Sequence, residues 1–280
     1  MTAGEALAAA AARLRAAGVD SPARDARILL AHAASVDAAR ITLIAPEDLS
    51  PDIEERFVNL VSLRAVRVPV SHLIGEREFY GRRFKVSRDV LDPRPETETL
   101  IETALAAPFG SVLDLGTGSG CILVTLLAER PQAVGTGVDI SEAACLQASA
   151  NAVLHGVEAR ADLRKSDWFD GVEGRFDLIV SNPPYLSADE MQNVQPELQQ
   201  HEPRIALTDE ADGLSVYRII ARDAARFLSP GGRVMVEIGW TQAQDVCAIF
   251  DAAGWQTIRV LQDLGGKDRV IQAQMAEIGN

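Results

Sequence analysis

The stretch Val112–Gly120, with the sequence VLDLGTGSG, joins an apolar strand to a glycine-rich turn and then to the start of a helix. Glycine lets the backbone adopt left-handed conformations and approach a ligand closely. The N-terminus of the helix favours a negatively charged group, such as a carboxylate. A strand, a tight turn and a helix in this order are typical of the first unit of a doubly wound α/β sheet.

Strand and helix patterns alternate through residues 111–280, and the helices have apolar faces, as in 119–129 and 214–228. This alternation predicts a Rossmann-like α/β domain. The predicted strands are residues 111–115, 134–138, 161–165, 176–181, 232–238, 256–262 and 268–274.

The glycine-rich turn predicts a nucleotide-like cofactor, and NAD and FAD sites share this feature. Asp139 lies 23 residues after Gly116, at the end of the second strand, where a carboxylate can accept from both ribose hydroxyls. The spacing GxGxG, with Asp114 two residues before Gly116, favours S-adenosylmethionine, because a carboxylate there suits an ammonium better than a pyrophosphate. Asp167 and Trp168 follow the third strand and are expected to flank an adenine, although Trp168 is also explained as a core aromatic. The predicted cofactor-binding residues are Asp114, Gly116, Thr117, Gly118, Ser119, Gly120, Asp139, Asp167, Trp168 and Asn182.

A second motif, Asn182–Tyr185 with the sequence NPPY, follows the predicted strand 176–181. The Asn182 side chain and the Pro183 carbonyl are two hydrogen-bond acceptors that the adjacent prolines hold in place. With Tyr185 as an aromatic wall, this arrangement suits a planar NH₂ group on an sp² carbon, such as an amide or an exocyclic amine. The alternative is an ordinary Asn-Pro turn after a strand.

Composition narrows the classes of function. The 280 residues are 47% hydrophobic, carry a formal charge of −13, and contain no apolar run long enough to span a membrane. The start of the chain lacks the pattern of a signal peptide, so we expect a cytoplasmic protein. Three scattered cysteines and four dispersed histidines indicate neither a disulfide framework nor a metal site. The negative charge disfavours broad nucleic-acid binding and suits a protein substrate or partner.

Residues 1–68 are expected to form a small all-helical domain that docks the substrate or serves only as a packing module. Helices are predicted at 4–17, 22–34 and 51–66, the last two beginning with an N-cap serine followed by proline. The apolar stripe of the third helix is Phe57, Leu60, Val61 and Leu63. Residues 69–93 are predicted to form a β-hairpin linker, and residues 94–280 the α/β domain.

With these motifs, nearly the whole chain resembles the PrmC/HemK family, the methyltransferases that modify glutamine in peptide chain release factors. The matching segments are Gly75–Gly81, Pro93–Glu98, Asp114–Gly120, Asn182–Tyr185, Glu202–Arg204, Asp212–Leu214, Glu237–Gly239 and Asp268–Val270. The resemblance implies an N-terminal helical bundle, a hairpin linker and a seven-stranded methyltransferase domain. The segment PRPETE differs from that of relatives that methylate a ribosomal protein, and so favours release factors. The N-terminal residues match least well.

The resemblance further implies methyl transfer from S-adenosylmethionine to the side-chain amide nitrogen (N5) of the glutamine in the GGQ motif of class-1 peptide chain release factors. Asn182, Pro183 and Tyr185 are the predicted catalytic residues, and together with Pro184 they bind the substrate. Glu96 and Glu98 either face the active site or cap the helix that begins beside them.

Three alternatives stay open. An adenine-N6 nucleic-acid methyltransferase uses the same NPPY loop, but it requires a basic recognition region that the sequence does not display. A non-catalytic module that binds translation factors leaves both intact motifs without a use. A dehydrogenase explains the glycine-rich turn but leaves NPPY unexplained.

Overall fold

The computed structural model describes residues 1–275, which divide into two compact units. The first unit is Met1–Glu76 with Gln195–His201, and the second is Arg77–Val194 with the chain from Glu202 onward. The predicted boundaries after residues 68 and 93 remain a prediction, and the last five residues of the predicted 94–280 domain lie outside the described part.

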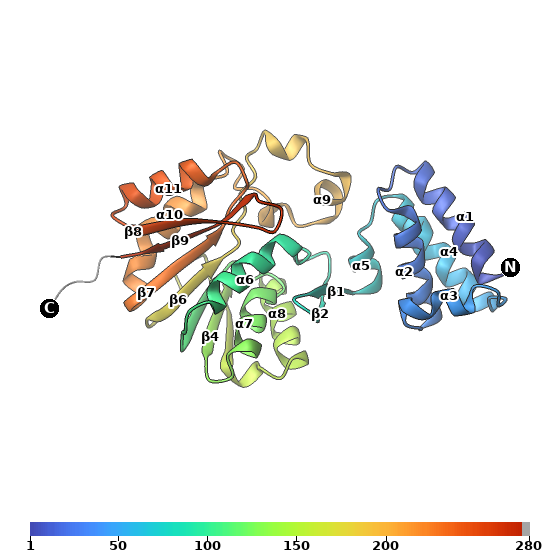
Figure 1. Ribbon diagram of the computed structural model, residues 1–280, viewed down its shortest axis with the longest axis horizontal. Helices are drawn as coiled ribbons and strands as arrows, with labels where there is room; N and C mark the ends of the chain where they lie inside the picture. The colour runs from blue at the N-terminus through green and yellow to red at the C-terminus, as the bar shows by residue number, and fades with distance from the viewer. Residues whose placement is uncertain (276–280) are drawn as a thin grey trace. The chain divides into compact units, whose positions relative to one another are not determined.

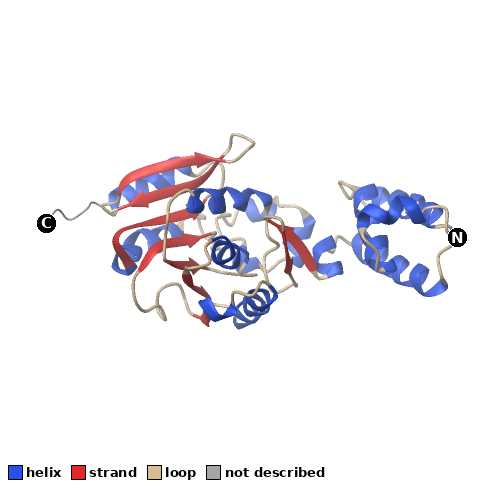
Figure 2. Cartoon of the chain, turned by 60° about the horizontal axis from the view of Figure 1, so that its bottom comes forward, coloured by secondary structure: helices blue, strands red, loops and turns tan. Residues whose placement is uncertain are grey.

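The second unit is built on one seven-stranded sheet with helices on both faces (Figures 1 and 2), as the alternating pattern predicts. Its strands are β3 (Ser111–Leu115), β4 (Val134–Asp139), β5 (Ala161–Lys165), β6 (Phe176–Ser181), β7 (Leu228–Glu237), β8 (Gln256–Gln262) and β9 (Asp268–Gln274). They lie in the order β5-β4-β3-β6-β7-β9-β8, and β9 is antiparallel to both of its neighbours. The strand β7 begins earlier than predicted, because Leu228 pairs with Phe176 ahead of a bulge.

The two faces of the sheet follow from the period-two alternation of apolar residues along each strand. In β7, Val234 and Val236 pack into one core, whereas Met235 between them packs into the other. The helices α6 (Glu98–Leu105), α7 (Cys121–Glu129) and α8 (Glu142–Leu154) cover the Met235 face, and α10 (Ser215–Asp223) and α11 (Ala243–Ala252) cover the opposite one (Figure 1). The predicted helix 214–228 is therefore α10 followed by the 3₁₀ turn η6 (Ala224–Phe227).

The strand order locates the site. The chain runs outward from β3 to β4 and β5, then returns to place β6 against the other side of β3. The glycine-rich turn after β3 and the NPPY loop after β6 thus leave the same edge of the sheet side by side. Ligands of open α/β sheets bind at such a switch point, where neighbouring connections diverge.

The first unit is a helical bundle with its own core. Its helices are α1 (Ala3–Ala16), α2 (Pro22–Ala34), α3 (Ile41–Ile44), α4 (Pro51–Ala65), α5 (Val70–Ile74) and α9 (Pro196–His201), with the short 3₁₀ turn η1 (Ala38–Arg40). Proline occupies the predicted first position of α2 and α4, but Ser21 and Ser50 make no side-chain capping bond. The prediction for Leu63 is wrong: it is exposed, and Arg64 takes the buried position one turn after Val61.

Arg64 is buried because two carboxylates pair with it. Its Nε lies 2.8 Å from Asp25 of α2, and its Nη1 lies 2.9 Å from Glu197 of α9. Glu197 also accepts from Arg67 at 2.7 Å. These ion pairs attach α9, which lies far along the chain in the loop after NPPY, to the helical unit.

The predicted linker 69–93 contains the helix α5 as well as the expected hairpin of β1 (Glu76–Phe79) and β2 (Arg82–Lys85). Tyr80 and Gly81 form its two-residue turn with φ of +49° and +68°. Phe79 and Phe84 are buried in the core of the second unit. The hairpin therefore packs as part of the second unit.

Candidate active site

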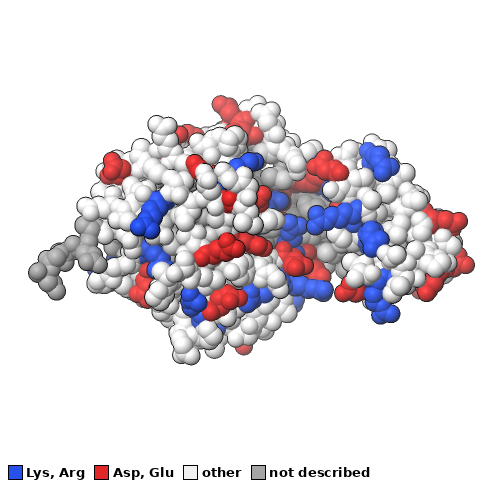
Figure 3. Space-filling view, in the orientation of Figure 1, with Lys and Arg blue, Asp and Glu red and all other residues white. Residues whose placement is uncertain are grey.

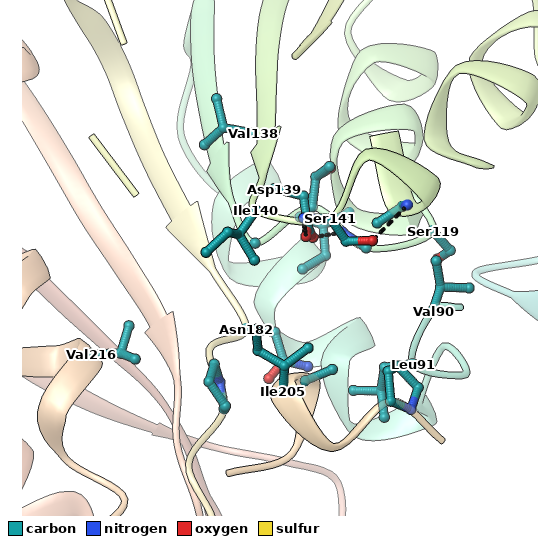
Figure 4. A pocket seen from close by; sticks show the side chains of 18 of the residues that line it. Val90, Leu91, Ser119, Val138, Asp139, Ile140, Ser141, Asn182, Ile205 and Val216 are labelled. Carbon is teal, nitrogen blue, oxygen red and sulfur yellow. Dashed lines mark hydrogen bonds between the residues drawn. The ribbon is translucent and has the colours of Figure 1, made fainter. Parts of the chain in front are cut away.

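A cavity of about 530 Å³ opens at the carboxyl ends of β3, β4 and β6. Figure 4 shows Asp139 and Asn182 on facing sides of this space, with Val90 and Leu91 along another side. Of the residues predicted to bind cofactor or substrate, nine line it: Gly116, Thr117, Gly118, Ser119, Asp139, Asp167, Trp168, Asn182 and Pro184. Four others do not, namely Asp114, Gly120, Pro183 and Tyr185. The fold thus brings the two motifs to one cavity.

Backbone hydrogen bonds to β4 shape the glycine-rich turn. The N–H groups of Gly116 and Thr117 both donate to the Val138 carbonyl at 2.9 Å. Gly120 has a φ of +77°, and a Cβ there would lie 2.9 Å from the Ala148 Cβ of α8. Glycine is therefore required at position 120, both for the backbone conformation and for helix packing. Because a residue with positive φ cannot be part of a right-handed helix, α7 begins after Gly120, at Cys121, and not at residue 119 as predicted.

Asp114 lies beneath the turn, fully buried. Its Oδ2 accepts from the Thr117 hydroxyl at 2.7 Å, whereas Oδ1 has no hydrogen-bond partner within residues 1–275. Burial raises the pKa of Asp114 to about 7, although the Thr117 hydrogen bond acts in the opposite direction. The positive charge of a ligand's ammonium group above the turn would lower the pKa of Asp114 and so favour its ionised form.

Asp139 ends β4 and lines the cavity. Each of its carboxylate oxygens accepts one backbone N–H, from Gly118 at 3.0 Å and from Ser141 at 2.9 Å (Figure 4 marks the latter). These two bonds fix the plane of the carboxylate and leave further lone pairs for a diol. Burial raises its pKa more than these hydrogen bonds lower it.

Trp168 contacts both the cavity and the core, and its role beside an adenine stays a prediction. Its side chain lines the cavity, and a Cβ on Gly116 would lie 3.7 Å from the ring, which is an ordinary van der Waals distance. The same side chain also packs against the core beneath the sheet. Asp167 is exposed at the rim.

The NPPY loop is held from several directions. The Tyr185 carbonyl accepts from Gln242 Nε2 at 2.8 Å, and Leu186 N–H donates to the Leu207 carbonyl at 3.0 Å. A Cβ on Gly213 would lie 2.4 Å from the Tyr185 carbonyl oxygen, so the chain passes the loop at backbone contact distance. Burial raises the pKa of the Tyr185 phenol to about 12, so it stays neutral.

Asn182 has a defined orientation. Its Nδ2 donates to the Thr97 hydroxyl at 3.2 Å, and no hydrogen bond within residues 1–275 reaches its Oδ1 or the Pro183 carbonyl. Both oxygens are thus free of protein donors in that range, and of these two residues Asn182 lines the cavity whereas Pro183 does not.

The sequence reasoning missed several residues at the cavity. Residues 203–206 and 208–210 line one wall, and the buried Glu202 just before them accepts from Arg94 and from the Asp92 backbone N–H. Thr97 also lines the cavity. In the sequence it lies between Glu96 and Glu98, the two residues that the sequence analysis considered for the active site. Glu98 accepts from the Tyr80 backbone N–H, so it stabilises the hairpin turn as well as beginning α6. The segments PRPETE and EPR match the PrmC/HemK family and were the available signal.

Charged side chains of both signs are interspersed over the visible face in Figure 3, with no continuous basic patch on that face. Among the described residues, no helix is long and apolar enough to cross a membrane. The same part of the chain contains no group of three or more His, Cys, Asp or Glu side chains arranged to hold a metal ion.

Comparisons with known proteins agree with this geometry. Residues 5–75 match the PrmC N-terminal domain, and residues 85–206 match the methyltransferase small domain. The chain is 54% identical to the release factor glutamine methyltransferase of Cereibacter sphaeroides, over 98% of this chain and 99% of the relative. It is 41% identical to the protein of the same name from Agrobacterium fabrum, over 95% and 94% of the two chains.

Among solved structures, the hMettl16 catalytic domain in complex with the MAT2A 3'UTR hairpin 6 has a TM-score of 0.60 at 14% identity, covering 79% of this chain and 84% of that one. This likeness shows a methyltransferase fold. The near full-length identity to the two bacterial relatives decides the family, as the sequence motifs predicted. The chain belongs to the release factor glutamine methyltransferase family.

Proposed function

We propose that this protein transfers a methyl group from S-adenosylmethionine to the side-chain amide nitrogen of the glutamine in the GGQ motif of class-1 peptide chain release factors. The observation that carries the proposal is the orientation of Asn182, whose Nδ2 is taken up by Thr97 while Oδ1 is left as an acceptor in the cavity wall. The names of the bacterial relatives supply the substrate class. An enzyme that acts on translation factors is expected in the cytoplasm.

The residues around the cavity suit the proposed methyl donor. The unpaired buried oxygen of Asp114 offers negative charge beneath the turn for an ammonium, and Asp139 offers two acceptors for a ribose diol. Trp168 and Asp167 line the cavity and would flank the adenine, and a Cβ on Gly118 would meet nothing within 4 Å, so the backbone there borders open space. When bound, S-adenosylmethionine supplies an electrophilic methyl group carried on a sulfonium.

In this proposal the residues of the NPPY loop hold and orient the substrate amide nitrogen that receives the methyl group. An amide nitrogen is a weak nucleophile because its lone pair is delocalised. Asn182 Oδ1 and the Pro183 carbonyl would accept its two hydrogens and aim its face at the methyl group. Tyr185 would pack beside the amide plane, and its neutral phenol adds no charge there.

No strong base is required before attack, because the amide proton can leave after the methyl group has been transferred. Positioning alone can supply about 7–11 kcal/mol when the reacting atoms are held in a near-attack geometry. The anchors of the NPPY loop at Gln242 and Leu207 support such rigidity.

An adenine-N6 methyltransferase is the alternative that uses the same acceptors on a flipped base. The net charge of −13 disfavours a nucleic-acid substrate, since phosphate binding depends on basic side chains. We therefore propose that no nucleic acid is a direct substrate.

The test is transfer of a tritiated methyl group from S-adenosylmethionine to a purified release factor. The matched control is the same factor with the tip glutamine changed to asparagine, and bulk DNA and RNA are offered in parallel. Label on the intact factor alone is the expected result. Label on nucleic acid, with none on the factor, would overturn the proposed substrate.

A further inference from the structure

We propose that Glu202 is a positioning residue for methyl transfer, because it anchors a stretch of chain that forms one wall of the cofactor cavity and also bonds to the residue after the NPPY motif. We call this stretch, residues 203–208, the wall segment. The proposal rests on the cofactor site and the reaction proposed above. Glu202 itself does not line the cavity, and it belongs to neither the glycine-rich turn nor the NPPY motif.

The wall segment lies directly against the cavity. It contains the 3₁₀ turn η5 (Arg204–Ala206), and the Leu207 N–H donates to the Arg204 carbonyl at 3.0 Å. All residues of the wall segment except Leu207 line the cavity. Figure 4 shows Ile205 on the side of the cavity away from Asp139. A ligand held by Asp139 would therefore have the wall segment on its other side.

The end of the wall segment is fixed to the NPPY loop. The Leu207 carbonyl accepts from the Leu186 N–H at 3.0 Å, and Thr208 forms a parallel bridge with Leu186. Leu207 and Thr208 are both buried, and Leu186 directly follows Tyr185. A displacement of the wall segment would therefore be passed to the loop that presents Asn182.

The beginning of the wall segment is fixed by Glu202. Its Oε1 accepts from Arg94 Nη2, and its Oε2 accepts from the Asp92 backbone N–H at 3.4 Å. Only 2% of the Glu202 side chain is exposed, so both bonds are shielded from water. Asp92 and Arg94 line the cavity as well. One buried carboxylate thus joins two parts of the cavity wall that lie 108 and 110 positions apart in the sequence.

The anchor stands where the chain returns to the second unit. The preceding residues, Gln195–His201, belong to the helical unit, and Glu202 is the first residue of the returning chain in the second unit. Within the wall segment, Arg204 pairs at 2.8 Å with Glu210, and more than half of each of these two side chains is exposed. Exposed ion pairs contribute little to stability, whereas a buried pair is costly to break. We therefore assign the anchoring to Glu202 and not to the pair of Arg204 with Glu210.

The expected effect follows from the fraction of molecules whose wall segment is in place. An apparent dissociation constant equals the intrinsic value divided by the fraction that is competent to bind. Glu202→Ala should lower that fraction and weaken the binding of S-adenosylhomocysteine about 10- to 100-fold, the equivalent of one lost hydrogen bond to a charged group. At saturating S-adenosylmethionine, kcat should also fall about 10-fold, because the far end of the wall segment bonds to Leu186.

The matched control is Glu190→Ala. Glu190 lies in the same loop, and its carboxylate also accepts one backbone N–H and one side-chain proton, both from Ser187, at 2.9 and 2.8 Å. Unlike Glu202, it is exposed, and its partner is a near neighbour in the chain. Calorimetry should give wild-type affinity for the control. A dissociation constant for Glu202→Ala within about threefold of wild type, or an equal loss in both variants, would overturn the proposal.

Glu202→Gln keeps the shape of the side chain, so it tests the anchor even if Glu202→Ala does not fold. Its one oxygen can accept from the Asp92 N–H, but its NH₂ group then faces Arg94, and the bond between the two side chains is lost. Arg94→Met removes the same bond from the other partner. Each variant should bind S-adenosylhomocysteine more weakly than wild type, and the double variant within about twofold of Arg94→Met. Losses that multiply in the double variant would refute the pairing.

Hydrogen exchange observes the wall segment directly and needs no substrate. In Glu202→Ala, the amides of Ala206, Leu207 and Thr208 should exchange about 10-fold faster or more, because their acceptors lie in the released turn. The amides of α7 should exchange at the wild-type rate. Unchanged exchange in the wall segment would exclude the anchor. Equal acceleration in α7 would indicate a general loss of stability and would exclude a positioning role.

The outcomes separate this inference from the proposed function. If wild type methylates no release factor, while Glu202→Ala binds S-adenosylhomocysteine weakly and its wall segment exchanges faster, the proposed substrate is wrong and the role of Glu202 stands. If wild type methylates a release factor, and Glu202→Ala binds and turns over as wild type does, the reaction stands and the role of Glu202 is wrong.

Discussion

Replacing Asp139 with asparagine tests the cofactor site with the smallest change in shape. Each Asp139 oxygen accepts one backbone N–H, from Gly118 and from Ser141, and the carboxylate also lines the cavity. In the variant, one acceptor becomes an NH₂ group that faces either a backbone N–H or the ribose. We therefore expect the variant to lose the negative charge at residue 139 and one hydrogen bond, made either by a backbone N–H or by a ribose hydroxyl.

The size of the effect follows from these contacts. Loss of one hydrogen bond to a charged group, with an uncompensated donor in its place, costs about 2–3 kcal/mol. This corresponds to an increase of about 30- to 160-fold in the dissociation constant. Because burial raises the pKa of Asp139, wild-type affinity should also weaken as the pH is lowered, whereas the variant should show no such dependence on residue 139.

Calorimetric titration with S-adenosylhomocysteine measures the affinity without turnover. Asp170→Asn is the control, because Asp170 lies three residues beyond Asp167 but is exposed and does not line the cavity. The control should bind as wild type does. A dissociation constant for Asp139→Asn within about threefold of wild type, or about 0.6 kcal/mol, would refute the role given to this carboxylate.

Three further predictions concern the same edge of the sheet. Asn182→Ala should lower kcat about 100- to 1,000-fold with little change in cofactor affinity, by analogy with the loss of one oriented polar group at a reacting centre; full methylation activity would contradict the mechanism. Gly120→Ala should lower the free energy of unfolding in urea by about 1–3 kcal/mol more than Gly174→Ala, because both glycines have positive φ but only at position 120 would a Cβ collide, with Ala148. Equal losses would show that strain alone matters. Asp114 has a pKa of about 7 in the folded protein, above its ordinary value of 3.8, so the free energy of unfolding of wild type falls as the pH rises from 3.8 to about 7. The free energy of unfolding of Asp114→Asn should therefore rise relative to wild type by about 2 kcal/mol between about pH 5.5 and about pH 8, and a constant difference would exclude this titration.

Local sequence signals predicted most of the fold because their causes are local. All seven strands were predicted, since alternating apolar residues such as Val234, Met235 and Val236 define which face of the sheet each side chain occupies. Errors arose where a boundary depends on a partner. The start of β7 depends on the pairing of Leu228 with Phe176. Leu63 is exposed because Arg64, which pairs with Asp25 and Glu197, takes the buried position beside it.

The sequence by itself determined the chemistry of the two motifs. Glycines at positions of positive φ and two adjacent prolines restrict the backbone wherever they occur, so the turn after β3 and the NPPY loop could be recognised from their letters alone. The matching segments across the chain also determined the family.

Only the tertiary structure decided what surrounds those motifs. Thr97 lies 85 positions before Asn182, yet its hydroxyl accepts from the Asn182 side chain because the 3₁₀ turn η2 (Pro95–Thr97) lies beside the loop that follows β6. In the same way, α9 joins the helical unit through the pairing of Glu197 with Arg64 and Arg67 and through the contact of His201 with the Val66 carbonyl. Such contacts between distant residues depend on the packing of whole elements, and no local pattern of residues encodes them.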